Sequence, residues 1–264
     1  MLRGMARIGA HLHDGYPLEV AKAMGVDTVQ FFLGDPQDWK APQFPGGHEP
    51  DQVREEFAAA GVTAYVHAPY VVNVASPNNR IRIPSRKILE QQLNAAAAIG
   101  AAGLIVHGGH VTAGTDPAEG YVSWRKAIER IERPLPMLIE NTAGGDGAMA
   151  RSLDNIARLW DAIISGGGDD VGFCLDTCHA YSAGEDLAIV VDRVKAITGR
   201  IDLVHCNNSR DPFDSGRDRH AGLPTGTIEP ELLVSVVRAA SADVICETPD
   251  PAVDVRWLRA ELGR

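Results

Sequence analysis

Positive charge is scarce in this chain. Its 264 residues include 25 Lys and Arg against 35 Asp and Glu, which gives a formal net charge of −10 with histidine neutral. Proteins that bind nucleic acid through a broad surface usually carry an excess of positive charge on it. The composition therefore argues against a generally basic DNA-binding surface, although bulk charge says little about any single site.

Cysteine and long apolar runs are also scarce. Four cysteines in a chain of this length do not form a disulfide-dependent scaffold. No apolar run reaches the roughly 18–20 residues of a membrane span, and the first residues lack the apolar core of a secretory signal. The contents of 45% hydrophobic and 23% charged residues are those of a globular protein. We therefore expect a cytoplasmic protein with no membrane partner.

Eight short apolar or β-branched runs recur along the chain, and each has the length of a strand that is buried on both faces. They cover residues 6–12, 28–33, 62–67, 103–108, 137–141, 171–176, 201–206 and 243–248.

Segments with helical signals lie between these runs. Residues 50–61, 151–166, 186–199 and 229–240 are expected to be helical, as are residues 85–100, with Pro84 in the first turn. We interpret 144–149, 166–170 and 207–227 as loops. Strands that alternate with helices eight times predict an α/β fold, namely a single (β/α)₈ TIM barrel domain over residues 1–264.

Six consecutive predicted strands end in a histidine or a carboxylate. These residues are His67, His107, Glu140, Asp176, His205 and Glu247. A lone histidine at a strand end is more often an ordinary polar residue than a ligand. The pattern of six overrides that interpretation, because active sites of such barrels lie at the carboxyl ends of their strands.

Three further candidates, His179, Asp218 and His220, follow the sixth and seventh strands. Together the nine residues offer five imidazoles and four carboxylates, a mixture that suits zinc and, with less preference, manganese or iron. Nine ligands are too many for one tetrahedral ion. With a shared carboxylate they would serve two or three metals that keep open positions, as catalytic metals do.

The cysteines are expected to be mainly small buried residues. Side chains alternate along a strand, so Cys206 and Cys246 should point away from the site and under the helices. Cys174 should face the barrel interior one layer below Asp176. Cys178 lies in the expected turn, and the sequence does not assign its direction.

Several ordered motifs resemble those of the endonuclease IV family of apurinic/apyrimidinic endonucleases. They are GFCLDTCHAYSAGEDL at 172–187, IENTAGG at 139–145, HCNNSRD at 205–211, GRDRH at 216–220, ICET at 245–248 and IGAH at 8–11. The segments HAPY, IPSRKI, HGGH and FLGDPQDWKAP resemble the actinobacterial branch of that family.

The resemblance implies a (β/α)₈ barrel with three zinc ions, manganese or iron being an alternative at one site. One zinc would be held by His67, His107 and Glu140, a second by Glu140, Asp176, His205 and Glu247, and a third by His179, Asp218 and His220. It also implies a monomer that cleaves double-stranded DNA 5′ to an abasic site, leaving a 3′-hydroxyl and a 5′-deoxyribose phosphate. Glu140 and Glu247 are the candidate catalytic residues.

The three divalent ions would more than offset the four carboxylates among these ligands. The phosphate groups of DNA would then be bound largely by the metal ions, and we expect weak affinity for undamaged DNA.

DNA contacts are expected from loops on the same face, although loop packing or solvation would explain the same residues. The candidates are Gln37, Trp39, Tyr70, Asn73, Arg210, Arg217 and Arg219. The chain departs from the family pattern at Asn208, His13 and Gln37. Asn208 stands where aspartate is common, a change expected to affect how His205 is oriented. Met5 is an alternative start.

Two other functions remain in competition. A sugar isomerase or epimerase would use the same barrel with one or two metals and, usually, a lysine or paired acids. A non-catalytic barrel that binds lesions or metal would be indicated by a lost ligand, and no candidate ligand is missing.

Overall fold

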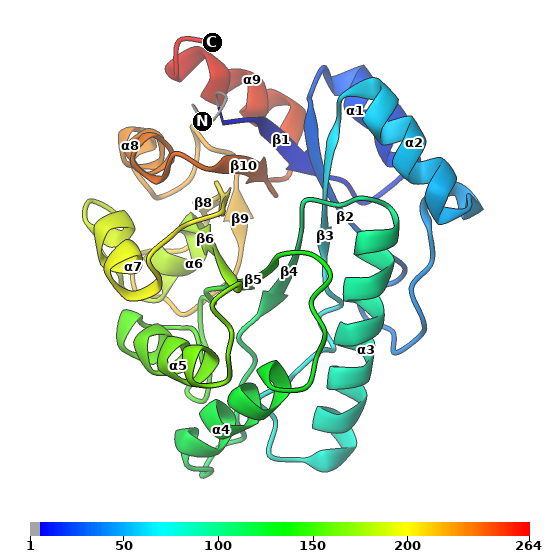
Figure 1. Ribbon diagram of the computed structural model, residues 1–264. Helices are drawn as coiled ribbons and strands as arrows, with labels where there is room; N and C mark the ends of the chain where they lie inside the picture. Colours follow the sequence, from blue (N-terminus) through cyan, green and yellow to red (C-terminus); the bar gives the residue numbers. More distant parts are fainter. Residues whose placement is uncertain (1–5) are drawn as a thin grey trace.

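Eight parallel strands close on themselves into a barrel in the computed structural model, which describes residues 6–264 (Figure 1). In chain order the strands are β1 Ile8–His11, β2 Thr28–Phe32, β3 Thr63–His67, β4 Gly103–His107, β5 Met137–Glu140, β6 Gly172–Asp176, β7 Leu203–His205 and β10 Asp243–Cys246. The barrel closes because β1 pairs with both β2 and β10. Met5, the alternative start, lies outside the described residues.

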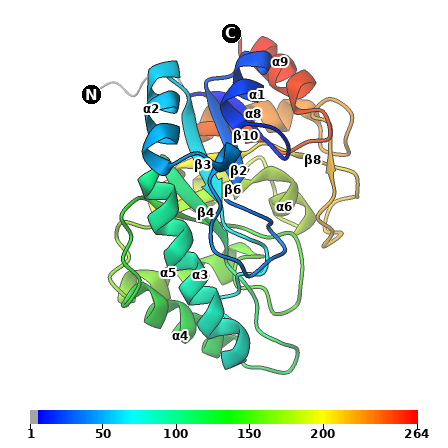
Figure 2. The same cartoon turned by 90° about the vertical axis from the view of Figure 1, so that its right-hand side faces the viewer.

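Helices surround this barrel (Figures 1 and 2). They are α1 Pro17–Met24, α2 Pro50–Ala60, α3 Asn79–Ala98, α4 Pro117–Ile128, α5 Leu153–Ser165, α6 Thr177–Ser182, α7 Val190–Thr198, α8 Pro230–Ala240 and α9 Pro251–Glu261, with a short 3₁₀ turn η1 at Pro45–Gly47. The predicted (β/α)₈ architecture is confirmed. No helix within residues 6–264 has both the length and the apolar character needed to cross a membrane.

Two helical predictions need correction. Helix α3 begins at Asn79, not after Pro84, because the Asn78 side chain accepts a hydrogen bond from the Arg80 N–H and caps an earlier first turn. Pro84 therefore lies inside the helix. Residues 177–182, expected to form a turn, are helix α6, whose first turn is capped by the Asp176 carboxylate.

The stretch 207–227 is also less irregular than expected. It contains two short strands, β8 Asn208–Ser209 and β9 His220–Ala221, which pair antiparallel. This pairing holds the segment that carries Asp218 and His220 against the barrel mouth.

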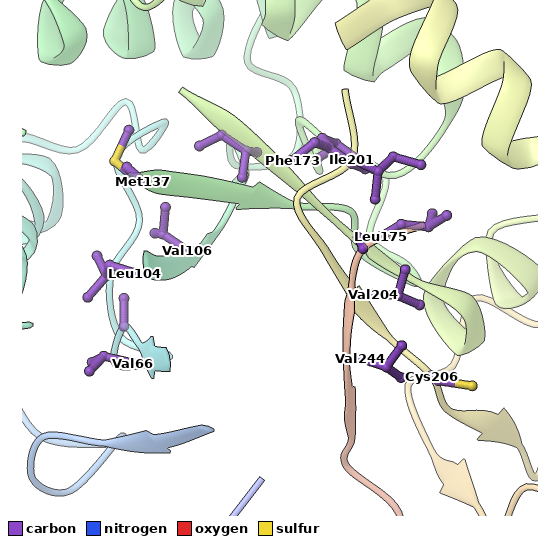
Figure 3. Close-up of a cluster of buried hydrophobic side chains, with 14 of the residues drawn as sticks. Val66, Leu104, Val106, Met137, Phe173, Leu175, Ile201, Val204, Cys206 and Val244 are labelled. Carbon is purple, nitrogen blue, oxygen red and sulfur yellow. The ribbon is translucent and has the colours of Figure 1, made fainter. Parts of the chain in front are cut away.

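The core has two layers, as alternating strand side chains require. The larger cluster packs between the strands and the helices, and Figure 3 shows part of it, including Val66, Leu104 and Cys206. A second cluster fills the barrel interior and consists of Tyr65, Ile105, Leu138, Cys174, Leu203 and Ile245. Cys206 and Cys246 belong to the outer cluster and Cys174 to the inner one, which confirms the predicted directions.

Candidate metal centre

The predicted site begins at the carboxyl ends of five consecutive strands. His67, His107, Glu140, Asp176 and His205 are the last residues of β3 to β7, in that order. The register places His107 level with Glu140 and Asp176 level with His205. Their side chains therefore meet above the inner core layer.

The remaining predicted residues reach the same mouth from loops and from α6. Glu247 follows β10 directly. The Asp176 carboxylate accepts a hydrogen bond of 2.7 Å from the His179 backbone N–H, and this cap turns α6 so that the imidazole faces the mouth. Asp218 and His220 arrive through β9.

Glu140 lies at the centre of the cluster. Its Oε2 is 3.1 Å from His67 Nε2 and 3.2 Å from His107 Nε2. Its Oε1 is 3.1 Å from His205 Nδ1. One buried carboxylate thus stands between two groups of nitrogen ligands.

Asp218 has a similar place on the other side of the mouth. Its Oδ2 is 3.1 Å from His179 Nε2 and its Oδ1 is 3.1 Å from His220 Nε2. The two imidazoles and the carboxylate therefore surround one small volume.

Four overlapping groups of potential ligand atoms result, each with its atoms within 4.8 Å of one another. They are His67, His107 and Glu140; Glu140, Asp176, His205 and Glu247; Asp176, His179 and His220; and Cys178, Asp218 and His220. All nine residues singled out from the sequence are included. The tenth, Cys178, is a protonated thiol, because burial raises its pKa to about 12.

The histidine hydrogen bonds test whether these residues suit a metal. Nδ1–H of His67 donates to the Ala68 carbonyl at 2.7 Å, that of His179 to the Asn141 carbonyl at 2.9 Å, and that of His220 to the Glu247 carbonyl at 2.9 Å. Because Nδ1 is hydrogen-bonded to a carbonyl, Nε2 is in each case the nitrogen that faces a carboxylate, about 3 Å away. A contact of this length needs a proton or a metal ion between the nitrogen and the oxygen, so the donor set fits bound cations.

Electrostatics support the same conclusion. Burial alone would lower the pKa of His179, but attraction to Asp176 and Asp218 outweighs it and raises that pKa well above the usual value. Burial likewise opposes the shift in His220, yet the hydrogen bond that its imidazole donates to Asp218 and the charge of Asp176 raise its pKa to about 9. The mouth of the barrel therefore has a strongly negative potential, which attracts cations.

Two residues that orient the site were not among those predicted from the sequence. Gln30 Oε1 accepts a 2.8 Å hydrogen bond from His205 Nε2, and Gln30 Nε2 donates to Glu247 at 2.7 Å. Asn207 donates from Nδ2 to Asp176 at 2.6 Å and accepts from the Glu247 N–H at 2.8 Å. For Gln30, the signal in the sequence was a polar side chain in the middle of the apolar run TVQFFL at 28–33.

The expectation for Asn208 was wrong. Its side-chain amide bonds to the backbone of Leu223 and Ile228 and does not contact His205. It fixes the loop that follows β9, while Gln30 sets the His205 ring. His13 is exposed, and its ring centroid lies 4.6 Å from that of the buried His11.

A hollow of about 580 Å³ opens beside the cluster. Its lining includes Trp39, Tyr70, Asn73 and His107. Tyr70 is 53% exposed and stacks on His107 with ring centroids 5.9 Å apart. Gln37 lies on the same loop as Trp39 and is exposed.

The other residues predicted to contact DNA form hydrogen bonds within the protein. Both polar atoms of the Asn73 side chain bond to the backbone of His110, so this residue joins two loops. Arg217 and Arg219 both pair with Asp211, and Arg210 donates to the His220 carbonyl. The three arginines remain exposed beside the Asp218 segment, and their contact with DNA stays a prediction.

Comparison with known proteins agrees with this geometry. Residues 18–262 match the family described as xylose isomerase-like TIM barrel. The chain is 56% identical to a protein of Mycobacterium tuberculosis named probable endonuclease 4 and 55% identical to its Mycobacterium ulcerans counterpart. Each match covers 97% of this chain and 99% of the relative.

Solved structures with the same fold include a member of the endonuclease IV family and proteins with other activities. Endonuclease IV from Thermus thermophilus superposes with a TM-score of 0.82 at 31% identity, covering 97% of this chain and 99% of that one. An L-ribulose 3-epimerase superposes with a TM-score of 0.74 at 18% identity over 98% of this chain and 94% of its own. The second likeness shows the fold alone.

Proposed function

This chain belongs to the endonuclease IV family, and from that premise we propose that it hydrolyses the DNA phosphodiester bond 5′ to abasic sites, using three zinc ions. The products would be a 3′-hydroxyl and a 5′-deoxyribose phosphate. The observation that carries the proposal is the position of Glu140 between two groups of histidine nitrogens, 3.1–3.2 Å from each. A carboxylate in that position can be shared by two metal ions.

We propose three ligand sets, which the short distances between ligand atoms support. His67, His107 and Glu140 would hold the first ion, and Glu140, Asp176, His205 and Glu247 the second. The third would be held by His179, His220 and Asp218, whose ligand atoms approach within 3.1 Å in pairs. Manganese or iron would be an alternative at one site, because the nitrogen and oxygen donors also accept those metals.

Bound metal ions would supply acidified water and neutralise charge on the scissile phosphate. The protein's part is to hold the ligands rigidly. Glu140 has both oxygens engaged by histidines, whereas Glu247 receives hydrogen bonds from Gln30 and Asn207. These contacts would hold both carboxylates, the candidate catalytic residues, in fixed orientations.

Tyr70 is placed to contact the DNA. Burial, with the nearby charges of Glu247 and Glu140, raises the pKa of its phenol well above the usual value. The hydroxyl therefore stays protonated and can donate to a phosphate without repelling it. An abasic nucleotide costs less to unstack than an intact one, which would favour its entry into the adjacent hollow.

A nicking assay tests the proposal. The metal-loaded protein is incubated with a duplex that carries one abasic analogue, and its ends are identified on a sequencing gel. We expect cleavage 5′ to the analogue, about three zinc ions per chain, and loss of cleavage with a chelator. Full metal loading without nicking would contradict the function. One manganese or cobalt ion per chain would instead favour a sugar isomerase or epimerase.

Glu140→Gln provides the matched variant, because glutamine keeps the size of the side chain and removes its charge. We expect loss of turnover and of bound metal. Unchanged turnover would indicate that the shared carboxylate does not act. A non-catalytic barrel that binds lesions or metal would show no turnover in the wild type either.

A further inference from the structure

Helix α3 starts with a basic segment that is unusual in this acidic chain. Residues 79–89 contain Arg80, Arg82, Arg86 and Lys87 and no acidic residue. Arg82 and Arg86 donate to backbone carbonyls. Within residues 6–264, the salt bridges of Lys and Arg involve other cations, so these four charges have no carboxylate partner.

A groove of about 640 Å³ lies between this segment and the loop that follows β2. Its lining contains no carboxylate and consists of Trp39, Ala41, Arg80, Ile83, Pro84, Lys87, Ile88 and Gln91. Arg80 and Lys87 are exposed and lie two turns apart, on one face of α3. Trp39 is 41% exposed and Ile83 is 61% exposed, which is unusual for side chains of their size.

The groove continues the hollow above the metal centre. Trp39 lines both, and Ile81 of α3 lines the hollow beside Tyr70 and His107. Figure 2 shows the segment after β2 running next to α3. A ligand seated over the metal centre and longer than one nucleotide would therefore meet this groove.

We propose that the groove between Trp39 and α3 binds the sugar–phosphate backbone of duplex DNA outside the damaged nucleotide. This inference rests on the proposed function, since it assigns a second contact region to the same substrate. Unpaired Arg and Lys side chains suit phosphate oxygens, and such contacts position a protein on DNA without reading sequence. The exposed face of Trp39 would pack against sugar or base.

Charge complementarity favours DNA over a protein partner here. Binding of two phosphates by Arg80 and Lys87 would release counterions, so affinity would depend on salt concentration. A hydrophobic protein partner on Trp39 and Ile83 would show little such dependence. The groove also gives the acidic chain a local basic surface that its total charge conceals.

The test compares wild type with the double variant Arg80→Gln/Lys87→Gln. Binding to a long duplex with one uncleavable abasic analogue is measured at several salt concentrations. Each lost phosphate contact lowers the slope of log affinity against log salt by about 0.9, so we expect a decrease of about 1.8. Arg193→Gln/Arg256→Gln removes the same charge from exposed positions of α7 and α9 and should leave the slope unchanged.

Cleavage of a short duplex that ends near the lesion separates the two hypotheses. If the variant cleaves the short duplex as wild type does, its fold and metal centre are intact. An unchanged slope on the long duplex would then overturn the groove as a DNA contact. If wild type cleaves neither duplex, the proposed endonuclease function fails, whereas the binding slopes still report on the groove. An equal fall in slope for the control variant would indicate a general charge effect and would also overturn the inference.

Discussion

His205 donates a hydrogen bond from Nε2 to the side-chain carbonyl of Gln30, with the two atoms 2.8 Å apart. This bond places a proton on Nε2 and directs Nδ1 toward Glu140, 3.1 Å away. Gln30 lies on β2 and His205 on β7, and both side chains are fully buried. The glutamine therefore decides which nitrogen of His205 faces the metal centre.

Gln30→Leu should weaken metal binding at the site shared by Glu140 and Glu247. Loss of a hydrogen-bond partner behind a metal ligand typically lowers affinity about 10- to 100-fold. Competition with a coloured chelator measures this, and Gln30→Glu serves as the comparison because it keeps an acceptor for His205. Equal metal affinity in wild type and Gln30→Leu would contradict the orienting role.

Asp218→Asn should remove one metal ion and leave the others. Asp218 forms ion pairs with His179 and His220, whereas Glu140 and His67 lie in other groups. The measured metal content should fall by about one ion per chain. Loss of all metal would show that the three proposed ligand sets do not bind their ions independently.

Metal binding should release protons, and its affinity should rise with pH. In the metal-free protein the pKa of His220 is about 9, so this imidazole keeps its proton at neutral pH, whereas a metal requires the free lone pair. The apparent affinity should increase as pH rises toward 9 and level off above it. Calorimetry in buffers of different ionisation enthalpy measures the released protons, and a buffer-independent heat at neutral pH would contradict the expectation.

The same shift has a consequence for stability. A histidine with a raised pKa stabilises the metal-free fold fully below its unfolded value of 6.5, and this contribution disappears as pH rises through about 9. In Asp218→Asn this part of the pH dependence should be reduced.

Gly9→Ala should destabilise the barrel strongly. A Cβ at this position of β1 would lie 1.7 Å from the Thr28 carbonyl oxygen, a backbone atom of the neighbouring strand. Overpacking of a rigid core costs about 1–3 kcal/mol, and a backbone clash should reach or exceed the upper value. Gly103→Ala on β4 is the matched control, since its Cβ would lie 3.3 Å from the nearest atom. Denaturant unfolding of the two variants gives the comparison, and similar stabilities would contradict the argument.

The barrel was predictable because its strands carry their own signal. Six of the eight buried runs end at or beside a histidine or a carboxylate, so the strand ends at His107, Glu140 and Asp176 were identified along with the strands themselves. The start of α3 was not, because the Asn78 cap competes with Pro84 and only the folded chain shows which helix start is adopted. Helix α6 was missed for a similar reason, since its cap is a residue interpreted first as a strand end.

The sequence by itself determined the fold class, the nine candidate ligands and the directions of three cysteines, because strand alternation and the parallel barrel place side chains by position alone. The tertiary structure decided what depends on distant contacts. Gln30 and His205 are 175 residues apart, and only closure of the barrel brings them within hydrogen-bonding distance. The basic face of α3 likewise becomes a groove only when the loop carrying Trp39 packs beside it.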